Sequence, residues 1–461
     1  MITGFKIEQK IHFVGIGGIG MSGLAQVLLD QGFKVSGSDL GESPILTLLE
    51  SKGAKIFKGH EASNVEDAQV VVRSSAISFN NPEVKWAIEN KIPVIKRAEV
   101  LAELMRNKVG IAVAGSHGKT TTTSILASIA KELELNATAV VGGIVKNIGS
   151  NAFWGNGKYV IAEADESDGS FLCLNPICSV LTNIDNDHLD FYGTKEKVEQ
   201  AFESFITQIP FYGIVVVNGH DKNLCDIALK GNKKYLTYGF KSKKSFCEVL
   251  DYEVQEKSTD ATHTVFVVKN EKEEAEFKMQ LAGEHNILNA TGAIALINQL
   301  GFSLEEISKA VGSFAGIKRR FEVVYNDENL VIVDDYGHHP TEIQATIQTA
   351  LKRYKDKDVS VLFEPHRFSR TERLWNEFTE CFTGVESVYI APIYPASEKE
   401  IKNITSERLA NEIQGAEATY LADWNLKELI EQHKDNNKVL LCLGAGKISR
   451  LLKEAIDELT V

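Results

Sequence analysis

The chain has 461 residues, of which 43% are hydrophobic and 25% charged, and its formal net charge is -13 at pH 7. This length predicts about three domains of roughly 100 to 200 residues, and the composition is ordinary for a soluble globular protein. The acidic balance argues against a nucleic-acid partner, because proteins that bind the phosphate backbone usually display a basic face.

The cysteine pattern and the longest uncharged run indicate the cellular compartment in which the protein is expected. The six cysteines contain no Cys-x-x-Cys pair, which favours free thiols in a reducing compartment over a disulfide framework or a zinc site. Residues 11–29 are uncharged but interrupted by glycines and a histidine, so we predict no membrane insertion. With no signal-peptide pattern, we expect a cytoplasmic protein.

Residues 10–20, KIHFVGIGGIG, predict a strand, a glycine turn and the start of a helix. The turn has the spacing of the dinucleotide fingerprint, and an acid ends the next predicted strand; these residues are Gly15, Gly17, Gly18, Gly20 and Asp39. The pattern places a diphosphate at the helix N-terminus and a ribose hydroxyl on the acid. The spacing of the glycines does not identify the base of the nucleotide, so we predict only that a nucleoside diphosphate binds here. The alternative is a βα turn that binds no ligand.

Ser74 and Ser75 follow the predicted strand that contains VVV, where open parallel sheets bind their ligands. Plain capping of the strand end explains them equally well. A further strand candidate, IPVIKRA, completes a small α/β domain that ends near residue 107.

Residues 109–123, VGIAVAGSHGKTTTT, predict a strand, a glycine turn and a helix that together form a phosphate-binding loop. Glycines let backbone amides converge on an anion, lysine reaches the terminal phosphates, and a threonine hydroxyl can ligate magnesium. Val113 replaces the first glycine of the general pattern, so a glycine-rich turn with an exposed lysine is the alternative. The predicted nucleotide-binding residues are Gly115, Ser116, His117, Gly118, Lys119, Thr120 and Thr121.

Two apolar strands downstream of this loop end in acidic residues, YVIAEADESD at 159–168 and CSVLTNIDNDHLD at 178–190. Carboxylates at strand ends beside a triphosphate site are suitable magnesium ligands, and solvated acidic loops are the alternative. Residues 241–280 alternate polar and apolar positions, which predicts antiparallel strands without a chemical role.

Polar residues near the third domain suggest further contacts. Asn286 and Asn289 share a helix face and could read an adenine edge, although capping or packing is the usual explanation for asparagine there. Arg319 and Arg320 lie in the predicted link to the third domain, where an arginine is usually solvated but could also reach a γ-phosphate.

The third domain shows repeated strand signals separated by helix-like stretches, which predicts a mostly parallel sheet. Polar residues gather after its strands: Asp335, Tyr336, His338 and His339, then His366, Arg367 and Arg370. The arginines would repel a metal cation, so we interpret this set as a carboxylate site. His366 and Arg370 are four positions apart, and the segment between them is expected to form one helical turn. Gly444-Ala445-Gly446-Lys447 lacks the Ser or Thr of a phosphate loop and is interpreted as a plain βα turn.

Seven motifs in this order resemble those of the Mur ligases over the entire chain: GSHGKTTTT, AEADESD, NIDNDHLD, HNILNA, RRFE, DDYGHHPTE and EPHRFSRT. The specific part is the pairing of GIGGIGMSG near the N-terminus with DDYGHHP and PHRFSRT near the C-terminus. The resemblance implies an α/β fold with three domains. These are a Rossmann-like UDP-sugar-binding domain (1–107), a P-loop ATP-binding domain with a mostly parallel sheet and small antiparallel strands (108–316), and a Rossmann-like amino-acid-binding ligase domain (317–461).

The resemblance also implies ATP, Mg2+ and a reaction of peptidoglycan precursor synthesis. ATP phosphorylates the lactyl carboxylate of UDP-N-acetylmuramate, and the amine of L-alanine attacks the acyl phosphate. The chemistry is reasonable because a carboxylate and an amine condense too slowly in water without a leaving group, and cations must spread the charge that develops. We expect small-molecule substrates, no nucleic acid, and a monomer or weak homodimer.

Carried over by motif, the resemblance implies individual roles. Lys119 would hold the β and γ phosphates, Thr120 with Glu163 the first magnesium, and His188 the second. Asn289 would bind adenine, and Arg320 with Asp335 would close the domains on ATP. The amino acid would be surrounded by Tyr336, His338, His366, Arg367 and Arg370, and the uridine diphosphate would face the glycines of the first turn with Ser74 and Ser75. The expected catalytic set is Lys119, Glu163, His188, Arg320 and His338.

Two positions depart from the family pattern, and two other functions stay open. Glu203 stands about where several relatives carry a carbamylated lysine, and Lys447 stands where we would expect an acid. A recycling ligase that adds an intact peptide to the same sugar nucleotide is the close alternative. A nucleotide switch or a dinucleotide oxidoreductase is the distant one, although a dehydrogenase needs no P-loop and a switch needs no third domain with arginine and histidine clusters.

Overall fold

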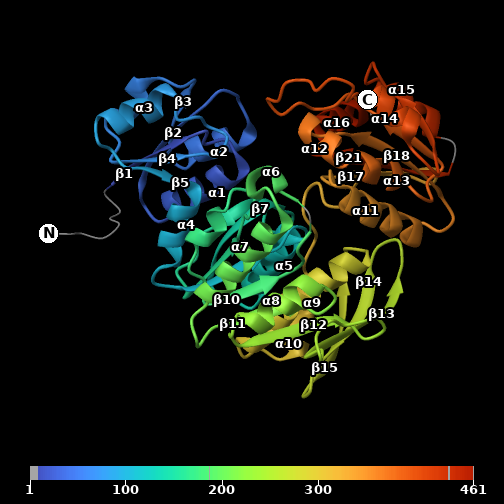
Figure 1. Ribbon diagram of the computed structural model, residues 1–461, viewed down its shortest axis with the longest axis horizontal. Helices are drawn as coiled ribbons and strands as arrows, with labels where there is room; N and C mark the ends of the chain where they lie inside the picture. The colour runs from blue at the N-terminus through green and yellow to red at the C-terminus, as the bar shows by residue number, and fades with distance from the viewer. Residues whose placement is uncertain (1–8, 186, 435–436, 460–461) are drawn as a thin grey trace. The chain divides into compact units, whose positions relative to one another are not determined.

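The computed structural model describes residues 9–185, 187–434 and 437–459. They form two compact units, which we call the larger and the smaller unit (Figure 1). The larger unit comprises the described residues of Met1–Gln255 with Phe266–Lys278 and Leu288–Ala315. The smaller unit comprises Glu256–Val265, Met279–Ile287 and the described residues of Gly316–Val461.

The first sheet of the larger unit has five parallel strands in the order β3-β2-β1-β4-β5, drawn in blue in Figure 1. The strands are β1 (Lys10–Val14), β2 (Lys34–Asp39), β3 (Lys55–Lys58), β4 (Val70–Arg73) and β5 (Val94–Lys96). They alternate with α1 (Ile19–Asp30), α2 (Pro44–Ser51), the 3-10 helix η1 (Ala62–Val65), α3 (Pro82–Glu89) and α4 (Arg97–Met105). Because all five strands run the same way, the residues that follow β1, β2 and β4 meet at one edge.

The second sheet has ten strands in the order β15-β14-β13-β12-β11-β10-β6-β9-β7-β8. Strands β6, β9, β10, β11 and β12 pair in parallel, whereas β7 and β8 are antiparallel. The strands are β6 (Val109–Ala114), β7 (Thr138–Val145), β8 (Ser150–Phe153), β9 (Tyr159–Glu163), β10 (Cys178–Leu181), β11 (Ile214–Asn218), β12 (Tyr235–Phe240), β13 (Tyr252–Thr259), β14 (Thr264–Lys269) and β15 (Glu274–Met279). The helices are α5 (Lys119–Glu132), η2 (Ser170–Cys173), α6 (Leu189–Tyr192), α7 (Lys195–Gln208), α8 (Lys222–Lys230), α9 (Glu284–Gln299) and α10 (Leu304–Val311).

Helix α1 of the first sheet packs against the β7–β8 hairpin of the second. The Asn151 side chain donates a hydrogen bond of 2.6 Å to the carbonyl of Ile19, and Gln26 donates one of 2.8 Å to that of Ala152. These bonds fix the first turn of α1, which follows the first glycine turn, against the sheet that carries the P-loop.

The smaller unit contains a third sheet in the order β16-β17-β21-β18-β19-β20, with only the β16–β17 pairing antiparallel among the described residues. Buried residues of α11, α13 and α14 form one apolar cluster with the sheet, and α15 and α16 form another. The strands are β16 (Glu322–Asn326), β17 (Leu330–Asp335), β18 (Asp358–Glu364), β19 (Ser387–Ile390), β20 (Glu417–Tyr420) and β21 (Lys438–Gly444). The helices are α11 (Pro340–Arg353), α12 (Phe368–Arg373), α13 (Trp375–Glu380), α14 (Ser406–Glu412), α15 (Leu426–His433) and α16 (Ile448–Leu459).

The expectation that all six cysteines are free is wrong. Cys225 on α8 and Cys247 in the loop after β12 form a disulfide, with their Cα atoms 5.7 Å apart. The loop folds back because the Phe246 amide donates a hydrogen bond to the Gly219 carbonyl, which brings together two cysteines that no short spacing links. Cys173, Cys178, Cys381 and Cys442 are free thiols.

Within the described residues, no helix is both long and apolar enough to cross a membrane.

Candidate functional site

The first glycine turn, between β1 and α1, is held by the predicted acid. Gly15 adopts a φ of 80°, and the Gly17 amide donates a hydrogen bond of 2.8 Å to Asp39 Oδ2. A Cβ on Gly17 would lie 2.9 Å from that oxygen, so a side chain there would disturb the contact. Ser74 lies beside Gly15, and Ser75 is exposed at the same edge. The structure therefore brings the predicted diphosphate-binding residues together.

The P-loop connects β6 to α5 through two glycines with positive φ, 138° at Gly115 and 83° at Gly118. A Cβ on Gly115 would lie 2.0 Å from Thr182 Oγ1, and one on Gly118 would lie 2.4 Å from Asn289 Oδ1. Both positions therefore require glycine for backbone conformation and for space. Asn289 is buried beside the N-terminus of α5, whereas the Asn286 side chain donates to the Ala282 carbonyl just before the start of α9.

Residues after β10 hold the P-loop from the side. The Asp185 amide donates to Ser116 Oγ over 2.9 Å, and the His117 amide donates to Asn183 Oδ1 over 2.8 Å. The His117 ring lies 3.1 Å from Asp185 Oδ2. The NIDND motif is thus in contact with the nucleotide loop, while Asn186 within it lies outside the described residues.

Lys119 makes an ion pair with a residue that sequence reasoning missed. Its Nζ donates to Glu166 Oε1 over 2.8 Å and to the carbonyls of Gly115 and Ser116. Burial lowers the pKa of Lys119, but the carboxylates, Glu166 first, outweigh burial and leave the pKa above its usual value. The Glu166 side chain is 1% exposed. Its position in the acidic AEADESD motif was the available signal, but the motif alone does not say which of four carboxylates faces the lysine.

The predicted magnesium ligands Thr120 and Glu163 are in contact, with Thr120 Oγ1 donating to Glu163 Oε2 over 2.9 Å. The Gly142 amide on β7 also donates to Glu163, over 3.0 Å. Thr121 is buried in the first turn of α5. A hydroxyl and a carboxylate at the start of a P-loop helix are hard oxygen donors, which fit Mg2+.

His188 lies beside the same cluster, with its Nε2 3.3 Å from Glu166 Oε1 and 3.5 Å from Asp187 Oδ2. Burial lowers the pKa of His188, but the hydrogen bond to Glu166 and the charge of Asp187 raise it above its usual value. Glu203 is half-buried on α7, and no described contact joins it to His188.

In the smaller unit, Asp335 ends β17 and accepts amide hydrogen bonds of 2.7 Å from Phe321 and Gly337. Burial raises its pKa, and Arg320 partly offsets this. The Arg320 guanidinium lies 5.3 Å from the Tyr336 ring centroid and 3.9 Å from Glu342. Arg320, Asp335 and Tyr336 therefore belong to one local network.

The predicted carboxylate site is only partly assembled. The rings of Tyr336 and His338 are 5.3 Å apart, those of His338 and His366 are 5.9 Å apart, and Arg370 Nη1 lies 3.2 Å from His366 Nδ1. Arg367 is exposed with a φ of 72° and precedes α12, which begins at Phe368. The expected helical turn from His366 to Arg370 is therefore wrong, and the structure shows no shared helix face for the two arginines.

The two ring tautomers follow from these contacts. The His338 Nδ1 lies 3.1 Å from the Tyr336 carbonyl, which can only accept, so Nδ1 carries the proton and Nε2 is the acceptor. The His366 Nδ1 faces a guanidinium, which can only donate, so it accepts. Burial lowers the pKa of His338 below its usual value, and burial with Arg370 and Arg367 lowers that of His366 to about 4.

Sequence reasoning also missed Tyr394 and Glu364. Tyr394 stacks on His366 at 5.5 Å, and a Cβ on Gly446 would lie 2.6 Å from its ring. Glu364 is buried and accepts the amides of Lys447 and Ile448 at 3.1 Å. A carboxylate of the chain itself thus occupies the N-terminus of α16, which is consistent with the interpretation of this glycine turn as structural.

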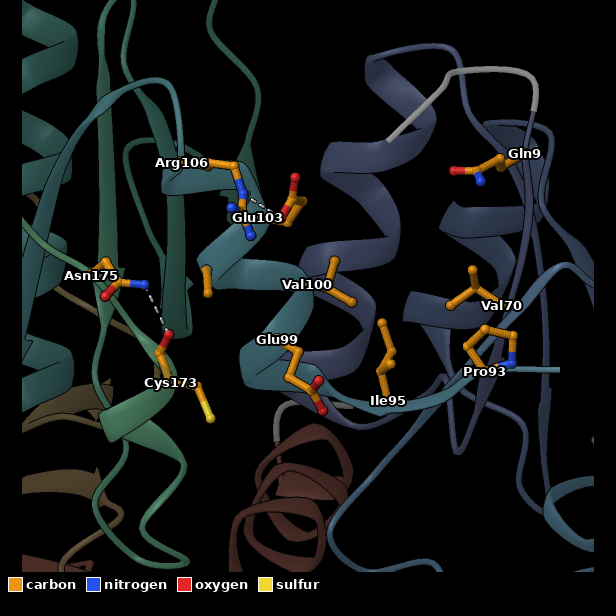
Figure 2. Close-up of a pocket in the computed structure, with 11 residues that line it drawn as sticks. Gln9, Val70, Pro93, Ile95, Glu99, Val100, Glu103, Arg106, Cys173 and Asn175 are labelled. Carbon is orange, nitrogen blue, oxygen red and sulfur yellow. Dashed lines mark hydrogen bonds and ion pairs between the residues drawn. The ribbon is translucent and has the colours of Figure 1, made fainter. Parts of the chain in front are cut away.

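One pocket of about 620 Å³ contains none of these residues. It is lined from the amino ends of β1, β4 and β5, from α4 and the residue after it, and from the end of η2 and the loop that follows. The lining includes Glu99, Glu103, Arg106 and Cys173. In Figure 2, Glu103 on α4 and Arg106, which directly follows this helix, are joined by an ion pair. Arg106 Nε lies 2.7 Å from Glu103 Oε2. The glycine turns lie at the carboxyl ends of their strands, so this pocket is separate from them.

Three family models match consecutive parts of the chain. They are the Mur ligase family catalytic domain at residues 10–109, the Mur ligase middle domain at 113–297, and the Mur ligase glutamate ligase domain at 319–446. The chain therefore belongs to the Mur ligase family, and the resemblance of its motifs is confirmed.

Individual members of the family are similar to this chain over nearly its whole length. The UDP-N-acetylmuramate--L-alanine ligase of Aquifex aeolicus is 43% identical over 98% of both chains, and that of Geotalea daltonii is 45% identical over the same share. The crystal structure of UDP-N-acetylmuramate-alanine ligase from Thermotoga maritima has a TM-score of 0.82 at 29% identity and covers 98% of this chain and 99% of that one. A murein peptide ligase from Psychrobacter arcticus has a TM-score of 0.72 at 23% identity over 98% of both chains, a likeness of fold alone.

Proposed function

We propose that this chain is an ATP-dependent ligase that joins L-alanine to the lactyl carboxylate of UDP-N-acetylmuramate in peptidoglycan precursor synthesis. The observation that carries the phosphoryl-transfer part is the P-loop lysine together with the Thr120–Glu163 contact at the start of α5. The acceptor and the amino acid come from the relatives that bear this name and match over 98% of the chain. We assign the sugar nucleotide to 1–107, ATP to 108–316 and the amino acid to 317–461.

Phosphoryl transfer would use the larger unit. A lactyl carboxylate oxygen attacks the γ-phosphorus, the bond to the β-phosphate oxygen breaks, and ADP leaves. Lys119 would exchange Glu166 for the phosphates, and the amides between Gly115 and Thr121 would bind them. We assign Asn289 to the adenine, and Arg320 with Asp335 to ATP as well.

The hydroxyl and carboxylate oxygens fit Mg2+, with Thr120 and Glu163 as the residues that would hold a first ion and His188 a second. When bound, the ion supplies positive charge that offsets the charge of the phosphates.

Amide formation would use the smaller unit. The amine nitrogen attacks the acyl carbon, the bond from this carbon to the phosphate oxygen breaks, and inorganic phosphate leaves. Arg370, oriented by His366, would bind the amino-acid carboxylate together with Arg367, and Tyr336 would lie beside them. The His338 Nε2 is the acceptor position for the amine proton.

The test supplies ATP, Mg2+ and UDP-N-acetylmuramate and measures phosphate release with L-alanine, glycine, L-serine and a tripeptide. We expect the highest kcat/KM with L-alanine. A preference for the tripeptide would instead identify a recycling ligase, and no phosphate release with any amine would reject a ligase. Lys119→Ala is the matched control: it should stop turnover and leave UDP-N-acetylmuramate binding in place, because the first glycine turn lies outside the P-loop.

A further inference from the structure

Arg97 lies at the first glycine turn, although no sequence pattern singled it out. It is the first residue of α4, and its guanidinium covers Gly20 in the first turn of α1. A Cβ on Gly20 would lie 2.5 Å from Arg97 Nη1 and 3.0 Å from its Cζ. Glycine at this position therefore lets the guanidinium approach the backbone at the N-terminal end of α1, and helix N-termini favour anions.

The guanidinium is held by one carboxylate and has donors to spare. Arg97 Nη2 lies 3.1 Å from Asp165 Oδ2, and the side chains are 27% and 37% exposed. This ion pair keeps the guanidinium in place beside Gly20. Arginine has five N–H donors, and this contact uses part of them.

The negative charge expected at the first glycine turn favours a cation such as the Arg97 guanidinium. The segment Ile19–Asp30 contains no lysine or arginine, and Asp39 already places a carboxylate against the turn. A diphosphate would add further negative charge at the same place. The dipole of α1 offers only about half an elementary charge, so a guanidinium beside Gly20 is the group that can offset both.

We propose that Arg97 binds the diphosphate of the sugar nucleotide, and that Asp165 positions it for this contact. The proposal rests on the proposed function, because it takes UDP-N-acetylmuramate as the ligand. Asp165 directly precedes Glu166, the partner of Lys119, so one short acidic segment positions the cations of both phosphate sites.

The test measures dissociation constants by titration calorimetry for UDP-N-acetylmuramate, for UDP and for a non-hydrolysable ATP analogue. We expect Arg97→Gln to weaken both uridine nucleotides at least tenfold and to leave the ATP analogue within about twofold. Arg97→Lys should retain part of the affinity, because the charge remains but the planar fork of donors is lost. Asp165→Asn should weaken binding less than Arg97→Gln does. Arg106→Gln, at the position that directly follows the same helix and paired with Glu103 at the pocket in Figure 2, is the matched control and should bind like wild type.

Three outcomes would overturn the proposal. UDP binding to folded Arg97→Gln at wild-type strength would exclude a diphosphate contact. Loss of UDP-N-acetylmuramate binding with unchanged UDP binding would assign the guanidinium to the lactyl carboxylate instead. Equal losses in Arg97→Gln and Asp165→Asn would reduce Arg97 to a structural link between the first two sheets. Failure of the wild-type chain to bind UDP-N-acetylmuramate would reject the proposed function itself, which separates the two failures.

Discussion

Glu166 is the residue on which the P-loop lysine depends. Both side chains are almost completely buried, at 1% exposed for Glu166 and 12% for Lys119, and their charged atoms are 2.8 Å apart. Removing one partner of a buried ion pair leaves the other charge without compensation, which typically costs about 3 to 5 kcal/mol. The pair therefore links the nucleotide site to the stability of the larger unit.

We expect Glu166→Ala to lower the free energy of unfolding by about 3 kcal/mol, measured by urea denaturation. Glu305→Ala is the control, because Glu305 and Lys309 form an exposed pair at 79% and 75% exposure. Such pairs contribute about 0 to 1 kcal/mol. Equal losses in the two variants would contradict a special role for the buried pair.

The histidines of the smaller unit make stability depend on pH. The pKa of His366 is lowered to about 4 by burial first and then by Arg370 and Arg367, whereas an unfolded histidine has a pKa of about 6.5. Between these values the unfolded chain binds more protons, so the stabilising contribution is fully present above about pH 6.5 and is lost as the pH falls towards 4.

We expect the melting temperature of the wild type to fall between pH 7 and pH 5, and His366→Asn to show a smaller fall over the same interval. Thermal unfolding followed by circular dichroism at both pH values measures the difference. Identical pH dependence in the two proteins would mean that His366 is not protonated on unfolding in this range.

At the scale of elements, the N-terminus of α5 lies close to Asn289 on α9, and this close contact requires glycine at position 118. Gly118 combines a φ of 83° with a contact to Asn289 that leaves no room for a Cβ. Gly301, after α9, has a φ of 105°, but a Cβ added there would meet no described atom within 4 Å. Substituting Gly301 therefore tests the cost of a left-handed backbone alone, whereas substituting Gly118 adds a steric clash with Asn289.

We expect Gly301→Ala to lower the unfolding free energy by about 1 to 2 kcal/mol, the cost of a left-handed non-glycine residue. Gly118→Ala should cost more and should also weaken binding of the ATP analogue, because Asn289 must move. Calorimetric titration and urea denaturation of both variants provide the comparison. Unchanged nucleotide affinity in Gly118→Ala would remove Asn289 and the α5 terminus from the binding site.

At the scale of the whole molecule, each ligand should stabilise the unit that binds it. A ligand that binds only the native state at a hundred times its Kd adds about 2.7 kcal/mol. UDP-N-acetylmuramate should therefore raise the melting temperature of the larger unit, whereas NADH should not, since we assign the first glycine turn to a sugar nucleotide. A shift with NADH and none with UDP-N-acetylmuramate would reject that assignment.

Local patterns in the sequence were sufficient for both glycine turns and for the strands that precede them, whereas β3, β7, β8, β11 and β12 were not predicted. A strand, a glycine turn and a helix start are consecutive in the chain, so their chemistry is readable from neighbours, as in residues 10–20 and 109–123. Such patterns also placed the acids after β9 beside the phosphate loop, because parallel strands bring their carboxyl ends to one edge. The pairing of Thr120 with Glu163 was implied by the resemblance to the Mur ligases, and the two side chains are in contact.

Only the tertiary structure decided which distant side chains meet. The structure shows that Lys119 pairs with Glu166 among the four acids of its motif, and that Arg97 lies against Gly20. It also shows that Glu364 accepts the first amides of α16, and that Cys225 and Cys247 form a disulfide. In the structure, α12 begins at Phe368, so Arg367 does not share a helical turn with Arg370. The physical reason is that burial and pairing of charges depend on packing between elements far apart in the chain, and no local spacing encodes that packing.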